Sequence, residues 1–167
     1  MNSAPMELRT AGRRVYIGKL AGTSVFDPIG DQVGKIHDVV VIFRYGSAAN
    51  VIGFVVEVGP RKRVFLPMTR VTSIESGSII TTGLLNMRSF TLRPMETLVL
   101  GQLFDRVVAL NDGSGDVKIL DVAMERRRPK DWVISKLHVQ RQRTTALGFI
   151  RSGETLNVSV SEVTGLR

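Results

Sequence analysis

The sequence contains no cysteine and only two histidines, His37 and His138, in 167 residues. The lack of cysteine excludes disulfide scaffolds, thiolate metal sites, iron–sulfur clusters and cysteine nucleophiles. No apolar run approaches the roughly 18–20 residues that a membrane-spanning helix requires, and residues 1–14 lack the apolar stretch of a secretory signal. The hydrophobic content of 43% is ordinary for a folded domain. We therefore expect a folded cytoplasmic protein, with the inner face of the membrane as an alternative location.

Motifs that carry catalysis are also missing from the sequence. The glycines form neither GxGxxG nor GxxxxGK[ST], so no phosphate-binding loop is predicted. No serine stands in the sequence context of a nucleophile elbow. His37 and Asp38 are neighbours on a predicted strand, where consecutive side chains point to opposite faces, so they do not form a catalytic dyad. We expect a protein that is not an enzyme and that holds no cofactor or metal ion of its own.

An internal repeat organises the chain. Aligned with a shift of 83 residues, Tyr16–Val39 matches Val99–Val122 without a gap, and eight of 24 positions are identical. Near the ends of the two units, Val71–Ile74 corresponds to Val163–Leu166 at a shift of 92, which indicates an extra loop in the second unit. The repeat predicts a flexible N-terminus at 1–14, one module at 15–82, a connector at 83–97 and a second module at 98–167.

Within each module the pattern is typical of short β-strands. Lys35–Phe43, Val51–Val58 and Arg63–Leu66 are rich in β-branched residues and are separated by turn residues. Strands this short, with turns this frequent, predict an all-β protein made of two tandem small β-barrels packed together. The apolar connector is either one helical turn over Leu84–Arg88 or an extended segment with some buried side chains.

The formal net charge of +8 divides evenly, +4 in residues 1–83 and +4 in residues 84–167, but it is unevenly placed. Residues 126–143 hold seven positive charges and one negative charge. The predicted interaction surface consists of Arg126, Arg127, Arg128, Lys130, Trp132, Arg141 and Arg143. Three interpretations stay open: a phosphate-binding footprint for nucleic acid, attraction to an anionic membrane, or a solvated loop that meets an acidic neighbouring domain.

Four residues repeated between the modules are predicted to be structural. Gly30 and Gly113 stand in equivalent turns, where glycine supplies backbone freedom. Asp38 and Asp121 stand at equivalent points of two strands, and a carboxylate that faces the backbone amides of a neighbouring turn would lock the fold. Nothing near either carboxylate in the sequence marks a second catalytic acid.

These repeated residues resemble a known family. Gly30-Asp31-Gln32-Val33-Gly34-Lys35-Ile36-His37-Asp38-Val39 resembles the opening of a PRC-barrel domain, and Lys118-Ile119-Leu120-Asp121-Val122 keeps part of this pattern in the second module. The resemblance implies small β-barrels that act as interaction and assembly modules. RimM-type ribosome maturation factors carry such barrels, which implies RNA or ribosome association through the Arg126–Arg143 region as an alternative function.

A longer resemblance covers most of the chain. Val64–Ile74 and Ile79–Arg88 are similar to actinobacterial proteins in which tandem PRC-barrels precede an MgtE-type domain and CBS domains. This resemblance implies a regulatory or assembly role in magnesium transport, with MgtE-like or CBS domains as partners, either in the same full-length chain or in another. It implies Mg²⁺ sensing by the adjoining domains only, and it leaves open a homodimer.

Overall fold

The computed structural model describes residues 13–44, 49–75, 77–144, 146–148 and 150–166. The expected flexible N-terminus, 1–14, lies outside these residues except for Arg13 and Arg14, and Arg14 begins the first strand. Among the described residues, no helix has the length and apolar character needed to span a bilayer.

The described residues of the first half form seven strands and two short helical turns. Their bounds are β1 (Arg14–Tyr16), η1 (Ile17–Lys19), β2 (Ser24–Phe26), β3 (Gln32–Ile42), β4 (Asn50–Glu57), β5 (Arg63–Pro67), η2 (Met68–Arg70), β6 (Val71–Glu75) and β7 (Ser78–Thr81).

The second half follows the same order, without a counterpart of β7. Its elements are β8 (Glu96–Leu98), η3 (Val99–Leu103), β9 (Val107–Leu110), β10 (Asp116–Arg128), β11 (Asp131–Thr144), β12 (Ile150–Ser159), η4 (Val160–Glu162) and β13 (Val163–Thr164). The protein is therefore all-β, as the sequence predicts.

Strand irregularities repeat between the halves as well. In the β3–β4 pair, His37 and Ile52 are bulge residues that no partner residue faces. In the β10–β11 pair, Leu120 and Ser135 occupy the same positions, 83 residues later. A bulge bends its strand and re-aims the side chains beside it. Because the bulges recur at equivalent positions, both halves bend alike, and Asp38 and Asp121 each directly follow a bulge.

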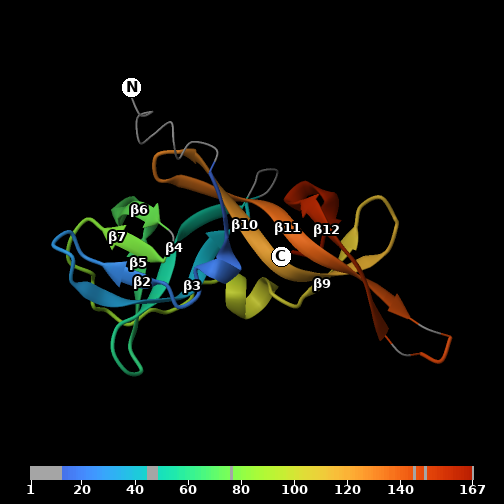
Figure 1. The fold of residues 1–167 in the computed structure, drawn as a ribbon, viewed down its shortest axis with the longest axis horizontal. Helices are drawn as coiled ribbons and strands as arrows, with labels where there is room; N and C mark the ends of the chain where they lie inside the picture. Colours follow the sequence, from blue (N-terminus) through green and yellow to red (C-terminus); the bar gives the residue numbers. More distant parts are fainter. Residues whose placement is uncertain (1–12, 45–48, 76, 145, 149, 167) are drawn as a thin grey trace.

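The two halves share one sheet, and the two packed tandem barrels predicted from the repeat are not seen. The described strands form a single 13-stranded sheet whose path does not close on itself. Three pairings cross between the halves: β1 lies along β10, β8 lies along β3, and β4 meets β11 through Val51 and Trp132. Each half thus gives its first strand to the other half. In Figure 1 the blue segment that leads from the N-terminal end runs beside β10.

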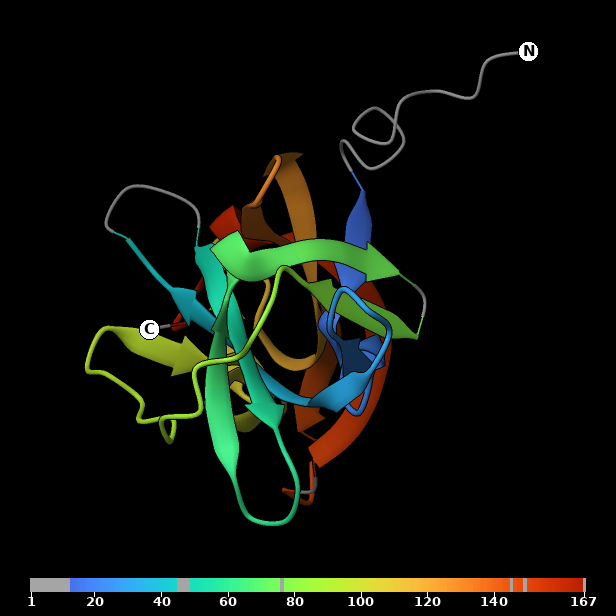
Figure 2. The ribbon, with the colours of Figure 1, turned by 90° about the vertical axis from the view of Figure 1, so that its left-hand side faces the viewer.

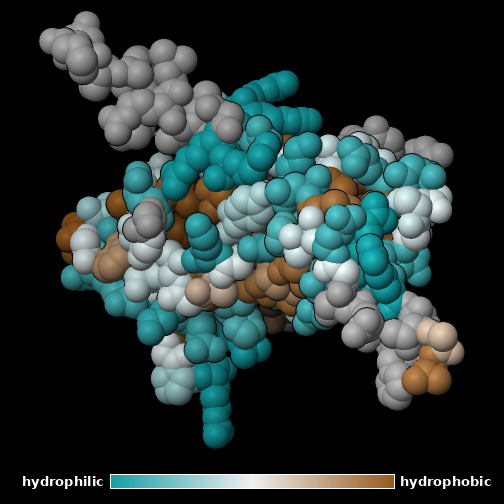
Figure 3. Space-filling model, turned by 45° about the vertical axis from the view of Figure 1, so that its right-hand side comes forward, coloured by the Kyte–Doolittle hydropathy of each residue, from teal (hydrophilic) through white to brown (hydrophobic). Residues whose placement is uncertain are grey.

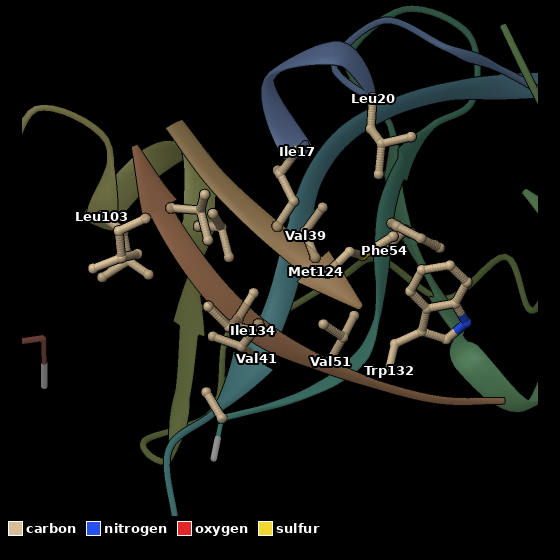
Figure 4. Packing of buried hydrophobic residues seen from close by; sticks show 14 of the residues in the cluster. Ile17, Leu20, Val39, Val41, Val51, Phe54, Leu103, Met124, Trp132 and Ile134 are labelled. Atoms are coloured by element: carbon tan, nitrogen blue, oxygen red, sulfur yellow. The ribbon is translucent and has the colours of Figure 1, made fainter. Parts of the chain in front are cut away.

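One hydrophobic core runs through both halves. Ile17 and Phe54 from the first half and Leu103 and Met124 from the second are fully buried members of one cluster. Figure 4 shows these side chains converging between strands of both halves. Each such side chain contributes roughly 1.5–3 kcal/mol by leaving water, so most of this stabilisation depends on both halves being present.

The connector is extended, so the helical turn considered for Leu84–Arg88 is not formed. Ser89 makes a bridge to Val64 beside β5, and the amide of Phe90 donates to the carbonyl of Arg63 at 2.7 Å. The rings of Phe90 and Phe65 stack with centroids 6.1 Å apart. These backbone and ring contacts with β5 hold the extended connector against the sheet.

Candidate interaction site

The predicted basic loop forms the tip of a long hairpin. β10 and β11 pair along most of their lengths and end with Arg128 opposite Asp131, so that Pro129 and Lys130 make the turn. Lys130 follows Pro129 in this turn and has a φ of 64°, the positive value that the third residue of a type II turn requires. Arg127, Arg128 and Lys130 are exposed at this tip, and Arg126 is half-buried. The hairpin tip therefore presents three exposed cations, with the half-buried Arg126 beside them.

Trp132, expected beside these cations, is part of the core. Its side chain is only 6% exposed and packs in the shared hydrophobic cluster near Val51 (Figure 4). In the sheet it lies opposite Arg126 on one side and Val51 on the other. A base needs an exposed aromatic face to stack on, and Trp132 does not offer one.

Arg141 and Arg143 lie at the other end of β11 and do not join the hairpin tip. Ten residues separate Arg141 from Asp131, which is about 33 Å along a strand. Arg141 is paired with Glu154 at 3.1 Å and lies next to the Ser114 carbonyl at 3.4 Å. The structure thus divides the predicted interaction surface into two groups.

Two arginines that the sequence placed in the flexible N-terminus complete the group at the hairpin tip. The Arg126 amide donates to the Arg13 carbonyl at 3.1 Å, and Arg14 lies opposite Glu125, with their charged groups 3.8 Å apart. We call Arg13, Arg14, Arg126, Arg127, Arg128 and Lys130 the basic crest. The available signal was the pair Arg13-Arg14 directly before the apolar residue Val15, but nothing in the sequence placed the strand that begins at Arg14 along β10.

A groove of about 400 Å³ lies below the basic crest. One wall is β6, and the other consists of Arg13, Arg126, Pro129, Lys130 and Trp132. In Figure 2, β6 crosses the top of the sheet, and the hairpin tip and β1 rise beside its upper edge. In Figure 3, hydrophobic surface is visible beneath long hydrophilic side chains on the upper part of the molecule. The groove therefore combines an apolar floor with a cationic rim.

Asp38 and Asp121 bind the helical turns of the opposite halves. The buried Asp38 carboxylate accepts the amides of Leu100 and Gly101, at 2.7 and 2.9 Å. Asp121 accepts the amide of Gly18 at 2.9 Å. Each carboxylate also accepts the amide of the residue that follows it. Both carboxylates are thus engaged with backbone amides that join the halves.

Gly30 and Gly113 form equivalent turns before β3 and β10. Their φ angles are 93° and 80°, in the region that favours glycine. The amide of Gly30 donates to the Asp27 carbonyl, and the amide of Gly113 donates to the Leu110 carbonyl. These residues set the two hairpin connections and lie in neither wall of the groove.

Groups suited to metal or acid–base chemistry are dispersed. Within the described residues, no three histidine, aspartate or glutamate side chains gather as a possible metal site. His37 is exposed, and His138 shares a 2.8 Å hydrogen bond with Asn157. The arrangement that stands out in the described part of the chain is therefore the groove with its basic crest.

Comparison with known families separates the two halves. Residues 12–84 match the model of the PRC-barrel domain, and residues 97–167 match the model of the Actinomycetes SH3 domain. The first match confirms the PRC-barrel resemblance for the first half. The second half matches under a different description, so these matches do not give two PRC-barrel domains in tandem. No curated protein matches the chain.

Proposed function

We propose that the protein is a non-catalytic interaction module that binds an acidic segment of another protein through the basic crest. The observation that carries this proposal is the convergence of Arg13 and Arg14 with Arg126–Lys130, which come from different halves of the chain. Two strands of different halves hold these cations above an apolar groove, and complementary charge both steers and selects a partner.

The sequence resemblance supplies a setting for this role. In that setting the acidic partner belongs to an MgtE-like or CBS region of a magnesium-transport protein, in the same chain or in another. This part of the proposal rests on the residues quoted from Val64–Ile74 and Ile79–Arg88, not on the geometry of the crest.

The alternative is an RNA- or ribosome-associated module. The cations of the crest favour it, because they could contact phosphates. The burial of Trp132 and the placement of Arg141 and Arg143 at the far end of β11 weaken it, since they remove a stacking platform and divide the phosphate footprint. An acidic protein segment needs neither feature.

The test compares three probes on the full chain: a glutamate-rich peptide, a single-stranded RNA of equal charge, and vesicles of anionic lipid. We expect the peptide to bind most tightly at physiological salt, and the triple variant Arg126→Glu, Arg127→Glu, Arg128→Glu to lose at least about tenfold in affinity. The control is Arg141→Glu with Arg143→Glu, which should retain binding. Tighter binding of RNA would support the alternative, and equal losses in both variants would contradict a site at the crest.

A further inference from the structure

The outer edge of β6, at one end of the path of the sheet, has no neighbouring strand among the described residues. Of the described strands, only β7 pairs with β6, which ends the path of the sheet. The difference between the halves explains this edge. In the second half, β13 pairs directly with β9, whereas in the first half β7 pairs in parallel with β2 and places β6 outside it. An open edge of this kind can accept an added strand.

Cationic side chains occupy the backbone acceptors along this edge. A guanidinium nitrogen of Arg13 donates to the Ile74 carbonyl. The ammonium group of Lys130 donates to the carbonyls of Thr69 and Val71, at 2.7 and 3.2 Å. Thus, the side chains of Arg13, directly before β1, and of Lys130, at the hairpin tip, make hydrogen bonds that the amides of a neighbouring strand would make.

The open edge of β6 also has a hydrogen-bond donor, the backbone amide of Ile74, beside the Ile74 carbonyl. In an antiparallel pair, the N–H and C=O of one residue point to the same side of the strand. The Ile74 carbonyl points toward Arg13, so the Ile74 amide faces the groove as well. Ile74 therefore presents both a donor and an acceptor, which is the pairing unit of a sheet edge.

The charges of the groove select the chemistry of the added strand. Arg13 contacts the edge at Ile74 and Lys130 contacts it at Val71, three residues and about 10 Å apart. Arg126 adds a third cation, and the one acid in the lining is Glu75, which accepts from the hydroxyl of its neighbour Ser73 on the same strand. Acidic side chains along an extended peptide would meet these cations once its backbone replaced them at the carbonyls.

We propose that an extended acidic segment of a partner protein binds by adding a strand to the open edge of β6, with its carboxylates beside Arg13, Arg126 and Lys130 and its apolar side chains above Trp132 and Pro129. This inference rests on the proposed function, because it specifies how the acidic partner is held. Main-chain hydrogen bonds supply affinity in this mode of recognition, and alternate side chains supply specificity. Displacing Arg13 and Lys130 from the carbonyls frees their charges for the partner.

The experiment uses the full chain and two capped peptides of alternating glutamate and valine, one unmodified and one N-methylated at alternate residues. The two have equal charge, but the methylated backbone cannot donate along one edge. We expect the unmodified peptide to bind at least tenfold more tightly and to protect the Ile74 amide from hydrogen exchange. A pair of protein variants accompanies the peptides: Arg13→Glu with Lys130→Glu should lose binding, and Arg141→Glu with Arg143→Glu should retain it.

The outcomes separate this inference from the proposed function. Equal binding of both peptides, or binding without protection of Ile74, would overturn strand addition but leave a charged docking surface. Arg13 and Lys130 would then only shield the edge of β6 from pairing with other strands. Failure of both peptides to bind, together with failure of the glutamate-rich probe, would overturn the proposed function itself.

Discussion

The carboxylate of Asp38, in the first half, accepts the amide of Gly101, in the second half, at 2.9 Å. The repeat places Asp121 and Gly18 at the equivalent positions, and these two residues make the same contact in the reverse direction, also at 2.9 Å. Each half therefore supplies both a carboxylate and a glycine turn to the contact with the other half. Because the same contact between carboxylate and glycine amide occurs twice, at equivalent positions of the repeat, both halves take part in the same way in holding the protein together.

Replacing Asp38 is expected to destabilise the protein more than replacing Asp121. Asp38 is 3% exposed and accepts three backbone amides, whereas Asp121 is half-buried and accepts two. Leaving buried amides without an acceptor costs about 1–3 kcal/mol for each. We expect the free energy of unfolding to fall by about 3 kcal/mol in Asp38→Ala and by about half of that in Asp121→Ala.

Chemical denaturation measures both changes, and Asp31→Ala, at an exposed turn position, is the control. Equal losses in all three variants would contradict a specific role for the two contacts between halves.

The glycines of the same contacts should rank in the opposite order. A Cβ atom at Gly18 would lie 2.9 Å from a carboxylate oxygen of Asp121, and one at Gly101 would lie 3.3 Å from that of Asp38. The first distance requires atoms to move, whereas a small shift relieves the second. We expect Gly18→Ala to destabilise the protein by about 1–2 kcal/mol and Gly101→Ala by less than about 1 kcal/mol. Thermal unfolding of the two variants checks this order, which a larger effect at Gly101 would contradict.

The sequence predicted the positions of the strands around Asp38 well, but it did not predict which distant strands pair with one another. The β-branched runs placed β3, β4 and β5 within a few residues, and the repeat marked Asp38 and Asp121 as structural positions. Pairing between distant strands has no local signal, so the repeat alone predicts two tandem barrels packed together. The sequence therefore did not predict that β1 pairs with β10 and β8 with β3, nor that Arg13 lies beside Arg126. For the same reason, the sequence predicts one surface from the cations of residues 126–143, whereas the length of β11 separates Arg141 and Arg143 from those at the hairpin tip.

The connector should depend on its stack against β5. Phe90 lies against Phe65, and its amide is hydrogen-bonded to Arg63. Stacked aromatic pairs contribute roughly 0.5–1.5 kcal/mol beyond the burial of their area. We expect Phe90→Ala to lower the free energy of unfolding by about 1–2 kcal/mol and to speed hydrogen exchange at the residue 90 amide. Leu84→Ala is the matched control, because Leu84 is 88% exposed. Unchanged exchange in Phe90→Ala would show that the backbone bridge alone holds the connector.

Acid should weaken the turn before β10. The hydroxyl of Ser114 holds the pKa of Asp112 below its ordinary value of 3.8, and the Ser114 amide contributes as well. Because the pKa is lower in the folded state, the stabilisation is present above the unfolded pKa and is lost as pH falls through the folded value. We expect Ser114→Ala to raise the pKa of Asp112 toward 3.8. Carboxyl NMR titration measures this change, and Ser24→Ala, in the other half, should leave the pKa of Asp112 where it is.

The two halves should fold only together. Each half gives its first strand to the other, and the hydrophobic core draws fully buried side chains from both. A fragment that begins at Arg13 and ends before the connector would lack the partner of β1 and the turn that Asp38 binds. We expect fragments cut at the exposed Leu84 to be unfolded alone and to regain β-structure when mixed in equal amounts.

Circular dichroism of each fragment and of the mixture tests this expectation, with the intact chain as the reference. The intact chain should unfold in one cooperative transition, because both halves contribute to one hydrophobic core. Fragments carrying Asp38→Ala and Asp121→Ala provide the matched control, since they keep the apolar core but lose both exchanged contacts and should associate less tightly. Two independently folded fragments, with transitions that sum to that of the intact chain, would show that each half closes its own core and that the shared sheet is only a contact between domains.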